Sequence, residues 1–329
     1  MSELYAFAGE KVSASRTEAS FTAEVVPRGP YSLALSARGA GNVCRRARGG
    51  VLTTLLEIDG RLELAEAGQR SDGTVVLRAT SASGLEALRF QLALDDDHSA
   101  FLERFARDPL LGRSIRALRG LRPIRLATIA HALLRALCCQ LITAREARAI
   151  EARIIHRVSP REFESGLCAP PTQARLAALS PAELCRLGLA PRRASALVRL
   201  CRTLDLERLR SLPPERVFAR LGRERTIGPW SLGVICLEGF GGYSHGLSGD
   251  LGLVKLCSVL EGRWVSEAET GKLLAHYGEW AGLASLYLLQ GSRRGLVPLG
   301  GGATDVGLAA RVVRSTSRPN TGATAALAE

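Results

Sequence analysis

The sequence contains little lysine, few aromatic residues and no long apolar run. Only three of its 44 basic residues are lysines, at positions 11, 255 and 272. A mechanism that needs an amine nucleophile therefore has few candidates. No stretch approaches the roughly 20 apolar residues that a membrane span needs, and the first residues lack the basic and apolar segments of a signal peptide. We expect a cytoplasmic bacterial protein without a membrane partner.

The cysteines are too scattered to form a metal site. The eight cysteines include no C-x-x-C pair and no cluster at zinc or iron–sulfur spacing. They predict reduced, mostly buried thiols and no bound metal. The glycine clusters at 239–242 and 300–302 lack the strand–turn–helix context of a dinucleotide or P-loop site.

The charge balance points to a polyanionic partner. The chain of 329 residues has a formal net charge of +12 and a pI near 9.9. Arginines that neutralise phosphates release condensed counterions, so nucleic acid is the leading partner class. An arginine-rich composition alone also raises the pI. Basicity therefore favours a polyanionic partner without identifying it.

Two patterns of hydrophobicity divide the chain. From Phe21 to about Leu94 apolar residues alternate with polar ones, and Asp59-Gly60 and Asp72-Gly73 mark tight hairpin turns. A helical stripe follows at Ala130, Leu134, Leu137 and Leu141. We predict an α+β protein with a small antiparallel β-sheet domain at 1–95 and an all-α domain at 96–300. Residues 315–329 are too polar and aperiodic for a core, which predicts a disordered tail.

Local signals refine the helical half. Ser180-Pro181-Ala182-Glu183 predicts a capping box at a helix start. Arginines recur at every third position between the two halves, and we interpret them as a solvated face in preference to a dedicated phosphate track. They are Arg113, Arg116, Arg119, Arg122 and Arg125.

The most informative segment is a predicted helical hairpin. One helix ends near Leu221, a second begins at Pro229, and the turn between them reads Arg225-Thr226-Ile227-Gly228. A glycine in such a turn lets the backbone approach a phosphate closely, and the next helix offers unpaired N–H groups to an anion. This arrangement holds a nucleic-acid backbone without reading its sequence.

This segment resembles the helix-hairpin-helix DNA glycosylases, whose motif reads Leu-Pro-Gly-Ile-Gly-Pro-Trp-Thr-Ala and is followed by Gly-Asp or Asp-Asp. Here Thr226-Ile227-Gly228-Pro229-Trp230-Ser231 is followed by Gly249-Asp250. The resemblance extends to Cys139-Gln140-Leu141-Ile142 and to Tyr277-Gly278-Glu279-Trp280. The segment from Phe21 to Leu94 is similar to the N-terminal sheet domain of the AlkA-type 3-methyladenine glycosylases. The all-α domain at 96–300 is thereby identified as a glycosylase domain.

The resemblance implies a role for each matching residue. Asp250 becomes the catalytic carboxylate, which stabilises the cationic sugar and directs water to it. The base is flipped out of the duplex into a pocket, and Gln140 and Leu141 match the wedge loop that fills the vacated space. Trp230 and Trp280 match the walls of the base pocket, where aromatic faces favour a cationic base. The phosphate-binding hairpin comprises Thr226, Ile227, Gly228 and Ser231.

Each assignment has a structural alternative. An aspartate after a glycine is often a helix cap, so Asp250 alone would carry little weight. Trp230 and Trp280 are also consistent with core aromatics, and Leu141 with a core position on its apolar stripe. Ala281 and Thr226 depart from the family pattern, which has arginine after the tryptophan and glycine at the start of the hairpin.

The resemblance favours hydrolysis of the glycosidic bond without strand cleavage. Members that also cut the strand carry a lysine where this chain has Trp230, and the iron–sulfur members need cysteines after Cys257. The family otherwise implies no cofactor except a monovalent cation that hairpin carbonyls near Glu224 and Ile227 can hold when DNA is bound. We expect a monomer, associated with the nucleoid, that removes 3-methyladenine and 7-methylguanine type lesions from double-stranded DNA. The alternatives are a non-catalytic protein that binds damaged DNA and an oxidised-base glycosylase with lyase activity.

Overall fold

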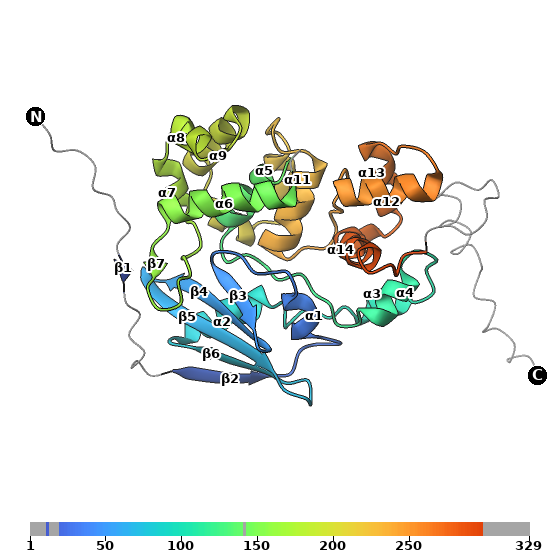
Figure 1. Ribbon diagram of the computed structural model, residues 1–329, viewed down its shortest axis with the longest axis horizontal. Coiled ribbons are helices and arrows are strands. Elements are labelled where there is room, and N and C mark those ends of the chain that lie inside the picture. The colour runs from blue at the N-terminus through green and yellow to red at the C-terminus, as the bar shows by residue number, and fades with distance from the viewer. Residues whose placement is uncertain (1–10, 13–19, 141–142, 299–329) are drawn as a thin grey trace, which may run out of the picture.

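The chain folds into an antiparallel sheet followed by a set of packed helices (Figure 1). The computed structural model describes residues 11–12, 20–140 and 143–298. The predicted wedge residue Leu141 and the predicted tail at 315–329 lie outside these residues. The predicted α+β class, with the sheet first and the helices after it, is confirmed.

The sheet has five strands in the order β2-β6-β5-β4-β3. Its part of the chain comprises β2 (Phe21–Val25), α1 (Leu33–Ala37), β3 (Arg45–Arg48), β4 (Val51–Ile58), β5 (Arg61–Gln69), β6 (Val75–Ala79) and α2 (Ala82–Gln91). Between β4 and β5, Asp59 and Gly60 both have positive φ, 50° and 77°, as a tight hairpin turn requires. The predicted turn there is confirmed. The helices α1 and α2 were not predicted, and α2 packs on strands of the sheet.

The helical part surrounds a second core. It comprises α3 (Ser99–Arg104), α4 (Gly112–Ala117), α5 (Ile129–Cys138), α6 (Ala144–Val158), α7 (Gln173–Ala178), α8 (Pro181–Arg186), α9 (Pro191–Thr203), η1 (Glu207–Ser211), α10 (Pro214–Leu221), α11 (Pro229–Val234), η2 (Ile235–Phe240), α12 (Leu251–Glu261), α13 (Glu267–Ala275), η3 (Gly278–Trp280) and α14 (Ala281–Ser292). A two-residue strand, β7 (Arg161–Glu162), pairs in parallel with β1 (Lys11–Val12). None of the helices in the described ranges is long and apolar enough to cross a membrane.

Helix α5 is the centre of the helical part. Ala130, Leu134 and Leu137 are fully buried, so the predicted stripe is confirmed for these three residues. The helix contacts α6, α9, α11 and η2. Figure 1 shows α11 between the group formed by α6 to α9 and the group formed by α12 to α14. The end of α5 therefore approaches the hairpin, on which the predicted site depends.

The arginines between the two halves do not form one solvated face. Arg113, Arg116 and Arg119 are exposed, but Arg122 and Arg125 are only 1% and 6% exposed. The Arg122 guanidinium donates to backbone carbonyls of 28–30 and of Ala93. Arg125 pairs with Asp96. The interpretation as a solvated face is therefore wrong for these two residues, because the connecting segment uses them to join the halves internally.

Candidate active site

The predicted helical hairpin is present. Helix α10 ends at Leu221 and α11 begins at Pro229, and α11 passes directly into the π-helix η2. The sequence predicted both helices but not the change to π-helical geometry. Such geometry is rare in proteins and is frequent near functional sites.

Gly228 lies at the exposed tip of the hairpin, as the N-cap residue of α11. Its φ and ψ are −83° and 179°, which any residue can adopt. A Cβ added there would meet no protein atom within 4 Å. Neither backbone conformation nor internal packing therefore requires a glycine at this position. An approaching group from outside the chain, such as a phosphate, gives a reason for it.

Thr226, in place of the family's first hairpin glycine, does not strain the turn. Among the residues that the structure describes, only Asp59 and Ala93 are non-glycine residues with positive φ. The Thr226 hydroxyl donates to the Glu224 carboxylate over 3.1 Å, and Glu224 also pairs with Arg199 of α9. The departure is therefore accommodated by a side-chain network beneath the hairpin.

Gln140 connects the end of α5 to the hairpin. Its Nε2 donates to the Thr226 carbonyl over 2.7 Å and to the Ser231 Oγ over 2.8 Å. Ser231 is only 2% exposed, so its hydroxyl points inward, and Ile227 is also buried. Of the four predicted phosphate-binding residues, Gly228 alone is exposed. The predicted wedge loop and the predicted phosphate-binding turn are thus hydrogen-bonded to each other.

A tight turn before α12 positions Asp250. Gly249 has a φ of +79°, and a Cβ there would lie 2.6 Å from the Cγ of Glu267. The positive φ and the closeness of the Glu267 side chain both favour glycine at this position. The Gly249 N–H donates to the Thr270 hydroxyl of α13, and the Leu247 N–H donates to Ser285 of α14. The turn is therefore fixed to both neighbouring helices.

The Asp250 carboxylate is held from two sides. Its Oδ1 caps α12 by accepting from the N–H groups of Gly252, over 2.8 Å, and Leu253, over 3.4 Å. Its Oδ2 accepts from the Trp230 Nε1 over 3.1 Å. Asp250 is both a helix cap and a partner of the hairpin, and the side chain is only half buried. A carboxylate in this position is oriented by its donors and is favoured by the helix dipole.

Close backbone approaches keep the loop from Gly241 to Asp250 against its neighbours. A Cβ at Gly233 of α11 would lie 2.5 Å from the Gly246 carbonyl oxygen. A Cβ at Gly282 of α14 would lie 2.8 Å from the His245 carbonyl oxygen. The loop therefore lies between the second hairpin helix and α14. The His245 ring packs against Phe218 in a tilted arrangement, with ring centroids 3.9 Å apart, which indicates a packing role for His245.

The two predicted pocket tryptophans have different surroundings. Trp230 is bonded to Asp250, whereas Trp280 contacts the rings of His98, Phe101 and Tyr243. No ring contact between the two tryptophans occurs within the described part of the chain. Both are partly buried against the helical core. Sequence reasoning missed His98 and Tyr243, because no spacing pattern marks them and only the fold brings them to Trp280.

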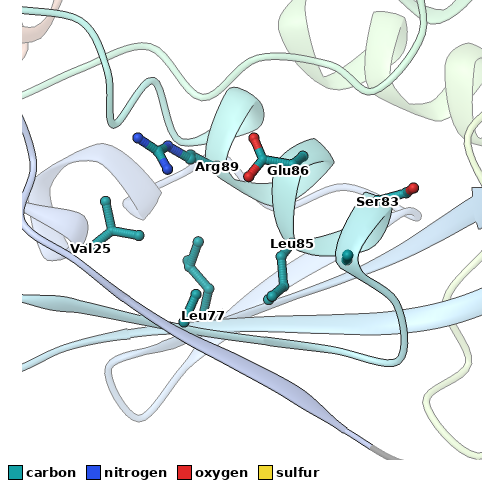
Figure 2. Close-up of a pocket in the computed structure, with 8 residues that line it drawn as sticks. Val25, Leu77, Ser83, Leu85, Glu86 and Arg89 are labelled. Atoms are coloured by element: carbon teal, nitrogen blue, oxygen red, sulfur yellow. The ribbon is translucent and has the colours of Figure 1, made fainter.

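A separate pocket of about 390 Å³ lies on the sheet part of the molecule. Figure 2 shows it between α2 and the strands β2 and β6. Apolar side chains form its floor, and none of its lining residues is a predicted site residue. Across residues 20–140 and 143–298, no group of three or more histidine, cysteine or carboxylate side chains could hold a metal ion.

The fold resembles that of DNA glycosylases of known structure. The 3-methyladenine DNA glycosylase from Archaeoglobus fulgidus matches with a TM-score of 0.70 and 20% identity, over 83% of this chain and 98% of that one. MBOgg1, solved with a low-affinity DNA ligand, matches at 0.68 and 16%, over 83% and 96%. The Clostridium acetobutylicum 8-oxoguanine glycosylase/lyase, solved with double-stranded DNA, matches at 0.66 and 18%, over 81% and 93%.

These similarities show that the chain has the helix-hairpin-helix DNA glycosylase fold. No family model and no curated protein matches its sequence. The names of the first and third proteins give different lesions, 3-methyladenine and 8-oxoguanine, so the shared fold does not identify the base that is removed. That choice depends on individual side chains.

Proposed function

We propose that this chain is a monofunctional DNA glycosylase that hydrolyses the glycosidic bond of alkylated bases, with Asp250 as its catalytic carboxylate. The observation that carries the proposal is the hydrogen bond from Trp230 to the Asp250 Oδ2. It links the residue at the start of the second hairpin helix to the carboxylate. A phosphate-binding turn and a sugar-directed anion are thus held in one rigid unit.

The chemistry needs only a few protein groups. A ring-alkylated purine carries positive charge and leaves without a strong general acid. One oriented carboxylate can then stabilise the cationic sugar and direct water to it. Because the bond is inaccessible in a stacked duplex, the nucleotide must first be flipped out. We assign Gly228 to the phosphate, Trp230 to the orientation of Asp250 and Trp280 to the base.

Carbonyls of the hairpin turn, which the family resemblance assigns to a monovalent cation, take part in hydrogen bonds. The Glu224 carbonyl accepts from the Ile227 N–H over 2.8 Å, and the Thr226 carbonyl accepts from Gln140. The Arg199 guanidinium lies against the Glu224 carboxylate. Each of these two carbonyls has one donor and a second lone pair, so the monovalent cation at the hairpin stays a prediction. We derive no step through such an ion.

The decisive test is the substitution Asp250→Asn. Asparagine is as good an N-cap as aspartate, so we expect α12 and the folding stability to be retained. Loss of the anion should lower the release of 3-methyladenine and 7-methylguanine from alkylated DNA at least about 100-fold. Release would be measured under single-turnover conditions, and duplex affinity by fluorescence anisotropy. Equal release by the variant and the parent would refute the assignment.

The two alternative functions predict different results. A non-catalytic DNA-binding protein would release no base with either aspartate or asparagine at position 250. An oxidised-base glycosylase with lyase activity would form a borohydride-trapped adduct with DNA through a lysine. We expect no such adduct, because Trp230 stands at the position of the lyase lysine and Lys255 and Lys272 lie on the later helices α12 and α13.

A further inference from the structure

His98 is a buried imidazole without a hydrogen-bond partner. It is the N-cap residue of α3 and is only 2% exposed. Neither Nδ1 nor Nε2 has a hydrogen-bond partner within the described part of the chain. A buried polar group left unpaired costs roughly 1–3 kcal/mol, so native proteins rarely keep one without a reason. The ring contacts of His98 are with the aromatic side chains of Tyr243 and Trp280, and these contacts do not require a polar ring.

Aromatic rings surround this imidazole. Tyr243 meets it edge-on, with ring centroids 4.7 Å apart, and Trp280 lies 6.2 Å away. Tyr243 also stacks on Trp280, at 6.1 Å and an interplanar angle of 26°. Three elements that are distant in the sequence therefore meet here: the start of α3, the loop after η2 and the turn η3. The cluster joins His98 to the ring assigned to the base.

The carboxylate, the hydroxyl and the terminal guanidinium nitrogens nearby already have partners. The Asp96 carboxylate accepts from both the Arg125 guanidinium and the Tyr243 hydroxyl. Arg122 donates to backbone carbonyls. Burial, with Arg122 and Arg125 nearby, lowers the pKa of His98 to about 3. The imidazole is therefore neutral near pH 7, with one N–H donor and one acceptor nitrogen, and it does not repel a cationic base.

We propose that His98 is a specificity-determining residue, whose ring edge hydrogen-bonds the flipped base beside Trp280. The proposal rests on the proposed glycosylase function and adds to it a residue that reads the base. In the free protein both nitrogens are closed to solvent. An entering base must shift the rings of Trp280 and Tyr243 to reach them. The unpaired nitrogens then gain the partner that the folded chain does not supply.

The test compares two properties of His98→Phe. The phenyl ring keeps the aromatic contacts and removes both nitrogens, so the fold should be retained. We expect single-turnover excision to fall at least about tenfold for the bases that the parent releases, as the loss of one hydrogen bond allows. Affinity for a duplex with a tetrahydrofuran abasic site, which has no base to read, should stay within about twofold.

Two further variants sharpen this test. His98→Asn keeps a donor and an acceptor and should retain more excision activity than His98→Phe. His276 also meets a tyrosine edge-on, with ring centroids 5.3 Å apart, and is the matched control. We expect His276→Phe to leave excision unchanged. Excision by His98→Phe within about twofold of the parent, or an equal loss of excision and of abasic-site affinity, would overturn the proposal. If the parent protein itself releases no base, the proposed glycosylase function is overturned as well. The activity of the parent therefore distinguishes a failure of the glycosylase function from a failure of the His98 proposal alone.

Discussion

At the scale of single residues, Gly228 and Gly249 are glycines for different reasons. Gly249 needs its positive φ and lies against Glu267, so the folded chain itself explains it. Gly228 has an ordinary backbone conformation and open space around the missing Cβ. Only Gly228 needs an explanation from outside the chain. The two positions therefore respond differently to alanine.

We expect Gly228→Ala to weaken DNA binding without unfolding the protein. The new methyl group would stand where the backbone is proposed to approach a phosphate, and affinity for an abasic-site duplex should fall at least about tenfold. Stability should change by less than about 1 kcal/mol, because a weaker N-cap is offset by a less flexible unfolded chain. Fluorescence anisotropy at fixed salt and urea unfolding would measure the two effects.

Gly68 provides the matched control for this experiment. It lies in β5, has no positive φ and likewise has no atom within 4 Å of an added Cβ. Gly68→Ala should leave DNA affinity unchanged. An equal loss of affinity in both variants would show that the effect of Gly228→Ala is not local to the hairpin.

At the scale of elements, Gln140 couples the end of α5 to the hairpin. Its amide bonds both the Thr226 carbonyl and the buried Ser231 hydroxyl. We predict that Gln140→Leu and Ser231→Ala are not additive in the free energy of unfolding. A double-mutant cycle should give a coupling of about 1 kcal/mol, the size of one buried hydrogen bond. Additive effects would contradict the coupling.

The elements show which features a sequence predicts well. Asp59-Gly60 and the capping box at Ser180 are local signals, and both are present as predicted. The hairpin was also predicted from adjacent residues, and the Gly249-Asp250 pair was identified by its resemblance to the family motif. The π-helix η2 and the contact of Gln140 with the hairpin were not, because both depend on packing between segments far apart in the chain. The same holds for His98, whose neighbours come from other elements.

At the scale of the whole molecule, buried arginines join the sheet part to the helical part. Arg122 donates to carbonyls of the segment between β2 and α1 and to the Ala93 carbonyl after α2. Arg125 binds Asp96, which also accepts from Tyr243, near the proposed active site. The recurrence of arginine at every third position does not distinguish these buried arginines from exposed ones. Their burial is a property of how the two parts pack and not of the local sequence.

The pH dependence of global stability reports on the buried imidazole. The pKa of His98 is lowered to about 3 by burial and by the nearby Arg122 and Arg125, with Asp97 acting in the opposite direction. An unfolded histidine titrates near 6.5, so between about pH 6.5 and 3 the unfolded chain binds one more proton than the folded chain at this site. His98 therefore contributes stability above pH 6.5 that is lost as the pH falls.

His98→Phe should remove this part of the acid sensitivity. Relative to the parent, the variant should lose about 1.4 kcal/mol less stability per pH unit between about pH 6 and 4. Urea unfolding at several pH values measures the difference. The buried His131, which pairs with Glu151, is present in both proteins, and its contribution cancels in the comparison. Parallel stability profiles would mean that the pKa of His98 is not lowered in the folded protein. The ring would then take up a proton as the pH falls through about 6.5, and the charged ring would repel cationic bases.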